Sequence, residues 1–222
     1  MAAAVNGNNH GMYLSPQFAT QDAAHASALI RDYPFASLIS VDDEGLPFVT
    51  PMPLHLIEEA ERWLLLGHCA KANPHWRYLQ TRPTAVVTFM GPQAYMSPSV
   101  YPDLARVPTW SYLTVHCTVR ARLIEHFDDK DRLLKHLIHD HDPAYEQQWR
   151  GLGDDYQQKM MAGMVAFELE VTNLQCKLKL NQHRPESHQA MHAVYEAGND
   201  DQRALAEWMV HLGLIGAAKG ES

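Results

Sequence analysis

Alternating apolar and polar residues mark the clearest predicted strand of the chain, over residues 113–123. Leucine, valine, cysteine and alanine occupy the odd positions there, and threonine, histidine and arginine occupy the even ones. A period of two predicts a strand with one buried and one solvated face. The same alternation recurs over residues 165–171 and 174–180, which we interpret as the two strands of a hairpin.

Shorter apolar runs predict further strands nearer the N-terminus. Residues 35–41 and 46–50 flank the acidic, glycine-containing turn 42–45, and this arrangement is typical of a hairpin. Two more strands are expected at residues 63–67 and 84–89.

Capping residues and prolines delimit the predicted helices. A first helix is expected at about residues 22–33, capped by Thr20 and ended by Pro34. A short helix follows Asn73, which offers a cap, and it has Pro74 at its first position, where the missing N–H costs nothing.

A helical insert is expected between the two β regions. It begins at Asp128 or Asp129 and stops ahead of Pro143. Two more helices are predicted near the end of the chain, at residues 186–197 and 200–212, the second capped by Asn199 or Asp200 and ended by Gly213.

Many antiparallel strands with a few peripheral helices and no βαβ alternation predict an α+β protein built on a β-barrel. The small polar residues at the start of the chain predict a frayed tail over residues 1–11. No linker or change in composition divides the rest, so residues 12–222 are expected to form a single domain.

Composition narrows the functional classes. The 222 residues are 46% hydrophobic and 20% charged, which is ordinary for a globular protein. The net charge of −8 has the wrong sign for a protein that mainly binds nucleic acid. Three widely spaced cysteines predict reduced thiols and a cytoplasmic location, and no apolar run is long enough to span a membrane.

Residues 67–74 are the most informative segment, because a strand end leads there through a short loop into a capped helix. His68 and Lys71 lie beside the helix start, whose free N–H groups favour an anion, so the loop suits a phosphate. An ordinary strand-to-helix connection with a solvated lysine is the alternative, and it is favoured by spacing alone.

Two further segments could line a pocket. Residues 91–99 and 107–112 are rich in proline, aromatic and hydroxyl side chains, and loops of this kind can hold a flat ligand. Lys177, Lys179 and Arg184 form a basic stretch that could contact an anionic ligand. For the two aromatic segments, the alternative is simple packing over one end of the barrel. For the basic stretch, the alternative is a solvated face of the sheet.

A histidine cluster suggests a metal site, which we do not favour. His136 and His139 are three residues apart on the predicted insert helix and could share an ion. His141 points elsewhere on a helix, and histidines near a helix C-terminus are favoured by the helix dipole alone.

Taken as a set, five segments resemble the PaiB-type family of FMN-binding negative transcriptional regulators. They follow one another from Met12 to about Ala193 and comprise residues 12–18, 67–76, 91–99, 107–112 and 179–185. The resemblance implies a split β-barrel related to pyridoxamine-phosphate oxidases, acting as a homodimer with FMN in clefts between the subunits. Four positions depart from the usual family pattern and alter the expected pocket lining: Lys71, Val100, Asn181 and His183.

The resemblance also implies positions for the cofactor-binding residues. Those expected at the FMN phosphate and ribityl chain are Gly67, His68, Lys71 and Asn73. Those expected beside the flavin ring are Thr50, Pro51, Ser97 and Trp110. Those expected to approach from the partner subunit are Lys179, Gln182 and Arg184.

Two functions of different classes follow from the resemblance. The first is a flavin-dependent oxidoreductase that acts on a small molecule and whose catalytic residues the sequence does not identify. The second is a DNA-associated repressor that uses the same dimer, although the acidic charge gives this little support. A barrel that has lost its cofactor and serves as a binding module is a third interpretation.

Overall fold

A single antiparallel sheet of seven strands forms the centre of the computed structural model, which describes residues 11–59, 62–103 and 105–216. The strand order is β2-β1-β5-β6-β7-β4-β3. The strands are β1 (Phe35–Val41), β2 (Pro47–Pro53), β3 (His55–Glu58), β4 (Trp63–Ala70), β5 (Thr84–Met96), β6 (Thr109–Ile124) and β7 (Met164–Lys179). Helices surround this sheet, so the predicted α+β class is confirmed. The predicted tail over residues 1–11 falls almost entirely outside the described residues.

The sheet curls until strands that are not neighbours in it meet. Met52 of β2 and Leu54 lie against Gly67 of β4. A Cβ atom added to Gly67 would lie 2.5 Å from Leu54 Cδ2 and 3.1 Å from Phe167 Cε2. Glycine is the residue that permits such a close approach of backbone and side chain. The absence of a side chain at Gly67 therefore allows the sheet to close around its core.

Strand β7 corrects one sequence prediction, because residues 165–171 and 174–180 do not form a hairpin. They belong to one continuous strand, which pairs with β6 along its length and with β4 at its beginning. The pairing shifts at a bulge, where Thr118 faces Asn173 but Val119 faces Val171. One extra residue in a strand moves the following side chains to the other face. The change of phase in the sequence therefore marks a bulge and not a turn.

Strands β5 and β6 correct a second prediction. Residues 91–96 and 109–112 are paired arms of these two long strands and not loops, and Tyr95 faces Trp110 across them. A register shift between Met90 and Gln93 accommodates the Gly91-Pro92 pair within the strand. The aromatic side chains of these segments therefore lie on a twisted ribbon at one end of the molecule.

The helices are α1 (Ala23–Asp32), α2 (His75–Thr81), α3 (Phe127–His141), α4 (Tyr145–Gly151), α5 (Asp154–Ala162), α6 (His188–Glu196) and α7 (Asp200–His211), with short 3-10 turns η1 (Pro16–Phe18), η2 (Pro98–Val100) and η3 (Pro185–Ser187). The cap of α1 is Asp22 and not Thr20, because Asp22 accepts the N–H of Ala24. The predicted start of α7 is confirmed, because Asn199 caps the helix and forms a capping box with Gln202.

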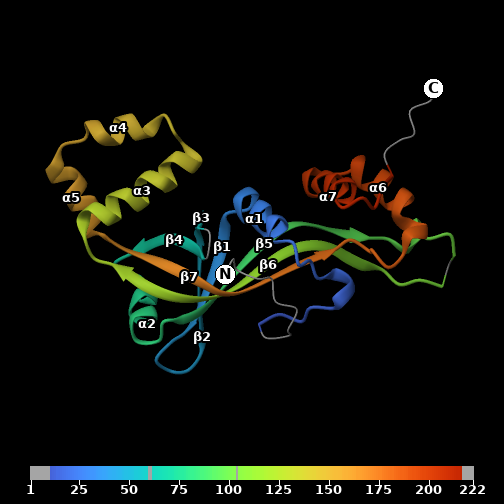
Figure 1. Ribbon diagram of the computed structural model, residues 1–222, viewed down its shortest axis with the longest axis horizontal. Coiled ribbons are helices and arrows are strands. Elements are labelled where there is room, and N and C mark those ends of the chain that lie inside the picture. Colours follow the sequence, from blue (N-terminus) through green and yellow to red (C-terminus); the bar gives the residue numbers. More distant parts are fainter. Residues whose placement is uncertain (1–10, 60–61, 104, 217–222) are drawn as a thin grey trace.

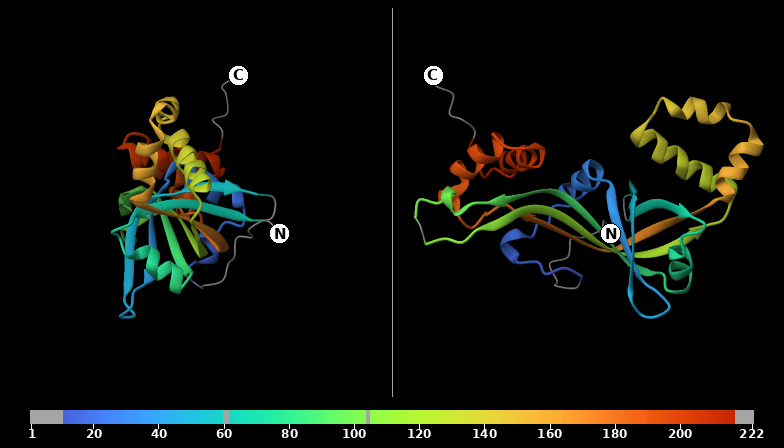
Figure 2. Two further views of the ribbon diagram at one scale, coloured as in Figure 1. Left: turned by 90° about the vertical axis from the view of Figure 1, so that its left-hand side faces the viewer. Right: turned by 180° about the vertical axis from the view of Figure 1, so that it is seen from behind.

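The insert between β6 and β7 contains three helices, of which the sequence predicted the first. That helix, α3, begins at Phe127, one or two residues before the predicted start at Asp128 or Asp129. Figures 1 and 2 show α3, α4 and α5 at one end of an elongated molecule and α6 and α7 at the other. The long strands β5, β6 and β7 connect the two ends. Among the helices of the described ranges, none combines the length and apolar character needed to cross a bilayer.

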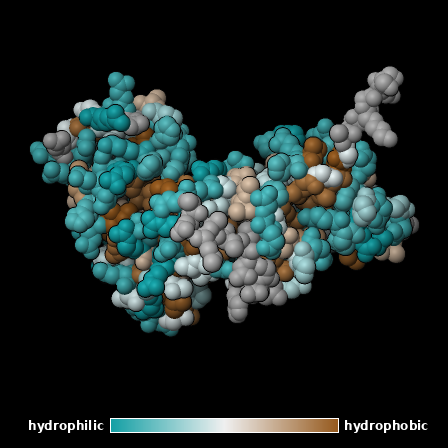
Figure 3. Space-filling model, in the orientation of Figure 1, coloured by the Kyte–Doolittle hydropathy of each residue, from teal (hydrophilic) through white to brown (hydrophobic). Residues whose placement is uncertain are grey.

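The core lies between the curled sheet and the helices α1, α6 and α7. Cys69, Cys117 and Cys176 are buried and free, as predicted. The surface drawn in Figure 3 is largely hydrophilic, with hydrophobic side chains gathered below the insert helices. A hollow of about 370 Å³ lies there, with Leu64, Leu66 and Leu133 among its lining residues.

Candidate functional site

Three residues join strand β2 to the start of helix α2. The amide Nδ2 of Asn73 donates a hydrogen bond to Thr50 Oγ1 (3.2 Å), and the same hydroxyl is hydrogen-bonded to Nδ1 of His75 (2.7 Å). The backbone N–H of His75 donates to Asn73 Oδ1 (3.0 Å). Helix α2 begins at His75 with Pro74 in the cap position, one residue later than predicted, so Asn73 binds the first helical N–H from just outside the helix. The structure thus brings together two candidate residues, Thr50 and Asn73. We call Thr50, Lys71, Asn73 and His75 the β4–α2 site.

His75 is a member of this site to which the sequence assigned no role. Its side chain is fully buried, with Phe48 packed edge-on against the ring at 5.2 Å. Burial lowers the pKa of His75 to about 4, so the ring is neutral at pH 7. Its Nε2 atom has no hydrogen-bond partner within the described part of the chain. The ring therefore contributes packing and one hydrogen bond to the site, but no positive charge.

Lys71 supplies the charge at this turn. Its backbone is fixed, because its N–H donates to the carbonyl of Gly163 (2.9 Å) and its carbonyl accepts from Trp76 Nε1 (3.1 Å). Its side chain is exposed, and none of the described carboxylates forms an ion pair with it. A fixed backbone that carries an unpaired ammonium group can receive an anion without breaking an existing salt bridge.

The other three candidates near this turn differ from one another in burial and packing. Gly67 is buried, and packing against Leu54 already accounts for it. His68 is partly buried on β4, and burial lowers the pKa of its ring. Pro51 is exposed on the edge strand β2, a position that tolerates the missing N–H.

The remaining candidates lie at the opposite end of the sheet. Trp110, Lys179 and Arg184 line a cavity of about 290 Å³. Ser97 accepts the N–H of Ser99 (3.2 Å) and caps η2. Gln182 accepts the N–H of Leu180 (3.0 Å) and also donates to the carbonyl of Leu178, so its amide closes the turn after β7.

The length of β7 separates these two groups of candidates. His68 pairs with Ala166 near the beginning of β7, and Lys179 is the last residue of that strand. At about 3.3 Å per residue, the two positions are roughly 40 Å apart along the strand. One small ligand can contact both groups only if they come from two copies of the chain.

The histidines considered for a metal lie in a third place. His136 of α3 stacks on His55 of β3, with ring centroids 5.0 Å apart. His55 Nδ1 is hydrogen-bonded to Asp140, one turn further along α3. The described residues contain no group of three or more metal-ligating side chains in a suitable arrangement.

Comparisons with known proteins bear on the β4–α2 site and on the fold. Residues 12–173 match the protein family described as "Putative FMN-binding domain". The chain is also similar to Protease synthase and sporulation protein PAI 2 of Bacillus subtilis, with 28% identity over 209 residues that cover 89% of this chain and 96% of that protein. The family match includes the whole β4–α2 site and ends before Lys179.

Solved structures share the fold at low sequence identity. The flavocytochrome Anf3 from Azotobacter vinelandii superimposes with a TM-score of 0.62 and 17% identity, over 80% of this chain and 77% of that chain. The FAD and heme binding protein from Mycobacterium smegmatis gives a TM-score of 0.58 and 18% identity, over 72% and 73% of the two chains. Because the family match spans well over half of its length, this chain belongs to the FMN-binding, PaiB-type family of split-barrel proteins.

Proposed function

We propose that the chain is a flavin-dependent oxidoreductase that holds the phosphate of FMN at the β4–α2 site. The observation that carries this proposal is the ammonium group of Lys71, which has no ion pair among the described residues. Lys71 lies two residues before Asn73, which is hydrogen-bonded to Thr50 and His75. When bound, the flavin supplies electron transfer to or from a small molecule. The chain itself has to bind the phosphate, orient the cofactor and exclude water.

The donors at the β4–α2 site fit a phosphate group. Lys71 offers a cation, and Asn73 retains an amide hydrogen beyond the one given to Thr50. Helix α2 has only seven residues, and Asn73 already accepts its first N–H, so side chains and not the helix terminus have to bind the anion. Because His75 is neutral, Lys71 is the cation on which the affinity should depend.

We propose further that the functional unit is a homodimer. The candidates Trp110, Lys179 and Arg184 cannot reach the β4–α2 site of their own chain, given the separation of roughly 40 Å along β7. A second copy could present them to the flavin held by the first. Light scattering on the purified chain, with and without FMN, tests this: a dimer is expected, and a monomer in both conditions would refute it.

An FMN titration tests the phosphate assignment. Replacing Lys71 by glutamate should weaken FMN binding by more than about tenfold, because the substitution turns an attraction into a repulsion. Arg82→Gln is the matched control: Arg82 is a cation at the end of α2, but it is already paired with Asp43 at 2.8 Å. Equal affinities of the Lys71→Glu and Arg82→Gln variants would show that the phosphate binds elsewhere.

A regulatory role is the second candidate. It is supported by the similarity to the B. subtilis protein, which is named Protease synthase and sporulation protein PAI 2. The net charge of −8 opposes tight DNA binding. A gel-shift titration against the upstream DNA of its own gene, over a salt series, separates the candidates, since true phosphate contacts weaken as salt rises. Binding that is absent at low salt would exclude the repressor role.

A further inference from the structure

We infer that the cavity at the far end of the sheet binds a second, planar anionic ligand with a single ring and a carboxylate or phosphate group. The cavity of about 290 Å³ is lined by the β5–β6 connection, the start of β6, the end of β7, the turn that follows β7 and one residue of η1. Its size is at the lower limit of small-molecule sites and suits one ring. The inference rests on the proposed function only in placing this ligand beside a flavin.

Cations are concentrated at this cavity although the chain as a whole is acidic. Lys179, Arg184 and Arg106 line it, and no aspartate or glutamate among the described residues does. Lys177 lies on the same face of β7, two residues before Lys179, and both ammonium groups lie over the ring of Tyr112, at 5.3 and 5.4 Å. Lys177 itself lies outside the cavity lining and donates to the carbonyl of Tyr13 (3.0 Å). Neighbouring cations repel one another, and an anion bound between them reduces this repulsion.

Much of this positive charge is not compensated by the protein. Lys179 Nζ donates to the neutral hydroxyl of Thr109 (2.7 Å) and has no ion pair with any described carboxylate. Arg184 has only a distant pair with Glu186, at 3.9 Å, and its side chain is 41% exposed. Burial lowers the pKa of Lys179, with a smaller effect in the same direction from Lys177 and an opposing one from Tyr112, and an anion beside Lys179 would favour its charged form.

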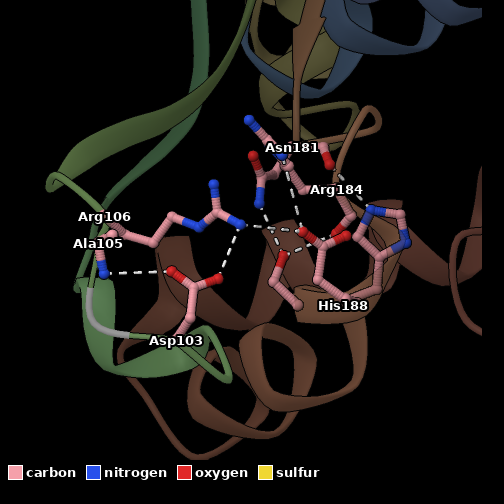
Figure 4. A network of polar contacts seen from close by, with 8 residues as sticks. Asp103, Ala105, Arg106, Asn181, Arg184 and His188 are labelled. Carbon is pink, nitrogen blue, oxygen red and sulfur yellow. Dashed lines mark hydrogen bonds and ion pairs between the residues drawn. The ribbon is translucent and has the colours of Figure 1, made fainter.

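Arg106 contributes one N–H group, at Nε, that has no hydrogen-bond partner among the described residues. Its guanidinium reaches from the β5–β6 connection towards the turn after β7 (Figure 4), and it bonds Asp103 (2.8 Å) and approaches Glu186 (3.7 Å). Its Nε atom is buried and has no hydrogen-bond partner among the described residues. A buried N–H of this kind costs stability unless a ligand or water accepts from it.

The turn after β7 is rigid in a way that suits a binding site. Asn181 has a left-handed backbone, with φ of 63°, which is uncommon for a residue other than glycine. Its Nδ2 donates to Ser187 Oγ (2.7 Å), and its carbonyl accepts from His188 Nε2 (2.9 Å) and from the N–H of Arg184 (2.9 Å). These bonds, drawn in part in Figure 4, fix the backbone that carries Arg184 into the cavity.

Aromatic side chains complete the cavity and explain the preference for a planar ligand. Phe18, Tyr101 and Trp110 line it, and Trp110 is 52% exposed. An exposed tryptophan beside unpaired cations offers a stacking face next to an anion site. In the proposed homodimer, the ligand here would be the reaction partner of the flavin held by the other copy.

Calorimetric titration of the full chain without FMN tests this inference, with phenyl phosphate and benzoate as probes. At least one probe should bind, more tightly than inorganic phosphate does, and the affinity should fall with rising salt. Arg184→Gln should weaken binding by about tenfold, and Trp110→Ala should remove the advantage over inorganic phosphate. Arg31→Gln, a cation paired with Glu58 on another face, should leave the affinity unchanged.

Three results would overturn the inference: neither probe binds, Arg184→Gln binds as tightly as the Arg31→Gln control, or inorganic phosphate binds as tightly as both aromatic probes. Lys71→Glu separates this site from the flavin site. If that variant loses FMN but still binds the probe, both assignments stand. If it retains FMN, the proposed phosphate site fails and the anion cavity is unaffected.

Discussion

The buried ring of His75 makes the stability of the fold depend on pH in a predictable way. Burial lowers its pKa from 6.5 to about 4 in the folded chain. The perturbation is acidification from pH 7.5 to pH 5, applied in parallel to the wild type and to His75→Gln. The glutamine variant cannot titrate in this range, so the difference between the two proteins isolates His75 from the other histidines.

The sign and size follow from proton linkage. Above pH 6.5 the ring is neutral in both the folded and the unfolded state, and it contributes no pH dependence. Between pH 6.5 and about 4 the unfolded state binds a proton that the folded state does not, so the free energy of unfolding falls as pH falls. The full loss is about 3 kcal/mol below pH 4, and about 2 kcal/mol is already lost at pH 5.

Urea denaturation followed by tryptophan fluorescence measures this effect. The stability of the wild type relative to His75→Gln should drop by about 2 kcal/mol between pH 7.5 and pH 5. Other buried histidines, such as His68 and His116, also have a pKa lowered by burial, but their contributions cancel in the difference. A difference that stays constant over this range would show that His75 is not buried as a neutral ring.

Three further predictions concern packing, capping and charge. Gly67→Ala should destabilise the fold by about 1–3 kcal/mol, because the new Cβ would meet Leu54 at 2.5 Å; an unchanged urea midpoint would contradict the closure of the barrel at this point. Asn199→Ala should cost about 1 kcal/mol through loss of the capping box of α7, measured in the same way against Asn199→Asp, which keeps the cap. Lys71→Arg should tighten FMN binding by up to about tenfold, since a guanidinium can bind two phosphate oxygens at once; weaker binding in an FMN titration would argue against a phosphate contact.

Local patterns in the sequence predicted most of the sheet but not how it continues. The alternation over residues 165–171 and 174–180 identified both halves of β7. The break between them was interpreted as a turn, because a bulge and a turn produce the same change of phase. Thr172 and Asn173 are compatible with either, and only the pairing with β6 decides between them.

Elements stabilised mainly by tertiary contacts could not be predicted. Strand β3 has four residues, and it is held by pairing with β4 and by contact with α1 and α3. Helices α4 and α5 carry little hydrophobic periodicity, and in α4 it is Trp149 that is buried. Short segments of this kind gain their stability from partners that are distant in the sequence.

The candidate site could be predicted in part. The hydrogen bond of Asn73 to the helix start and the cation at Lys71 follow from local chemistry, whereas Thr50 came from the family resemblance, since 23 residues separate it from Asn73. His75 was missed because nothing in the local sequence shows that this polar side chain is buried. The sequence feature that could have identified His75 is its position at the start of α2, where a side chain can turn inward against Phe48.

A crystal structure of the chain grown with excess FMN tests the central claim most directly. It should show a phosphate oxygen of FMN within hydrogen-bond distance of Lys71 Nζ and Asn73 Nδ2, and a second copy of the chain against the flavin ring. A flavin phosphate bound away from the β4–α2 site, or a flavin enclosed by one copy alone, would contradict it.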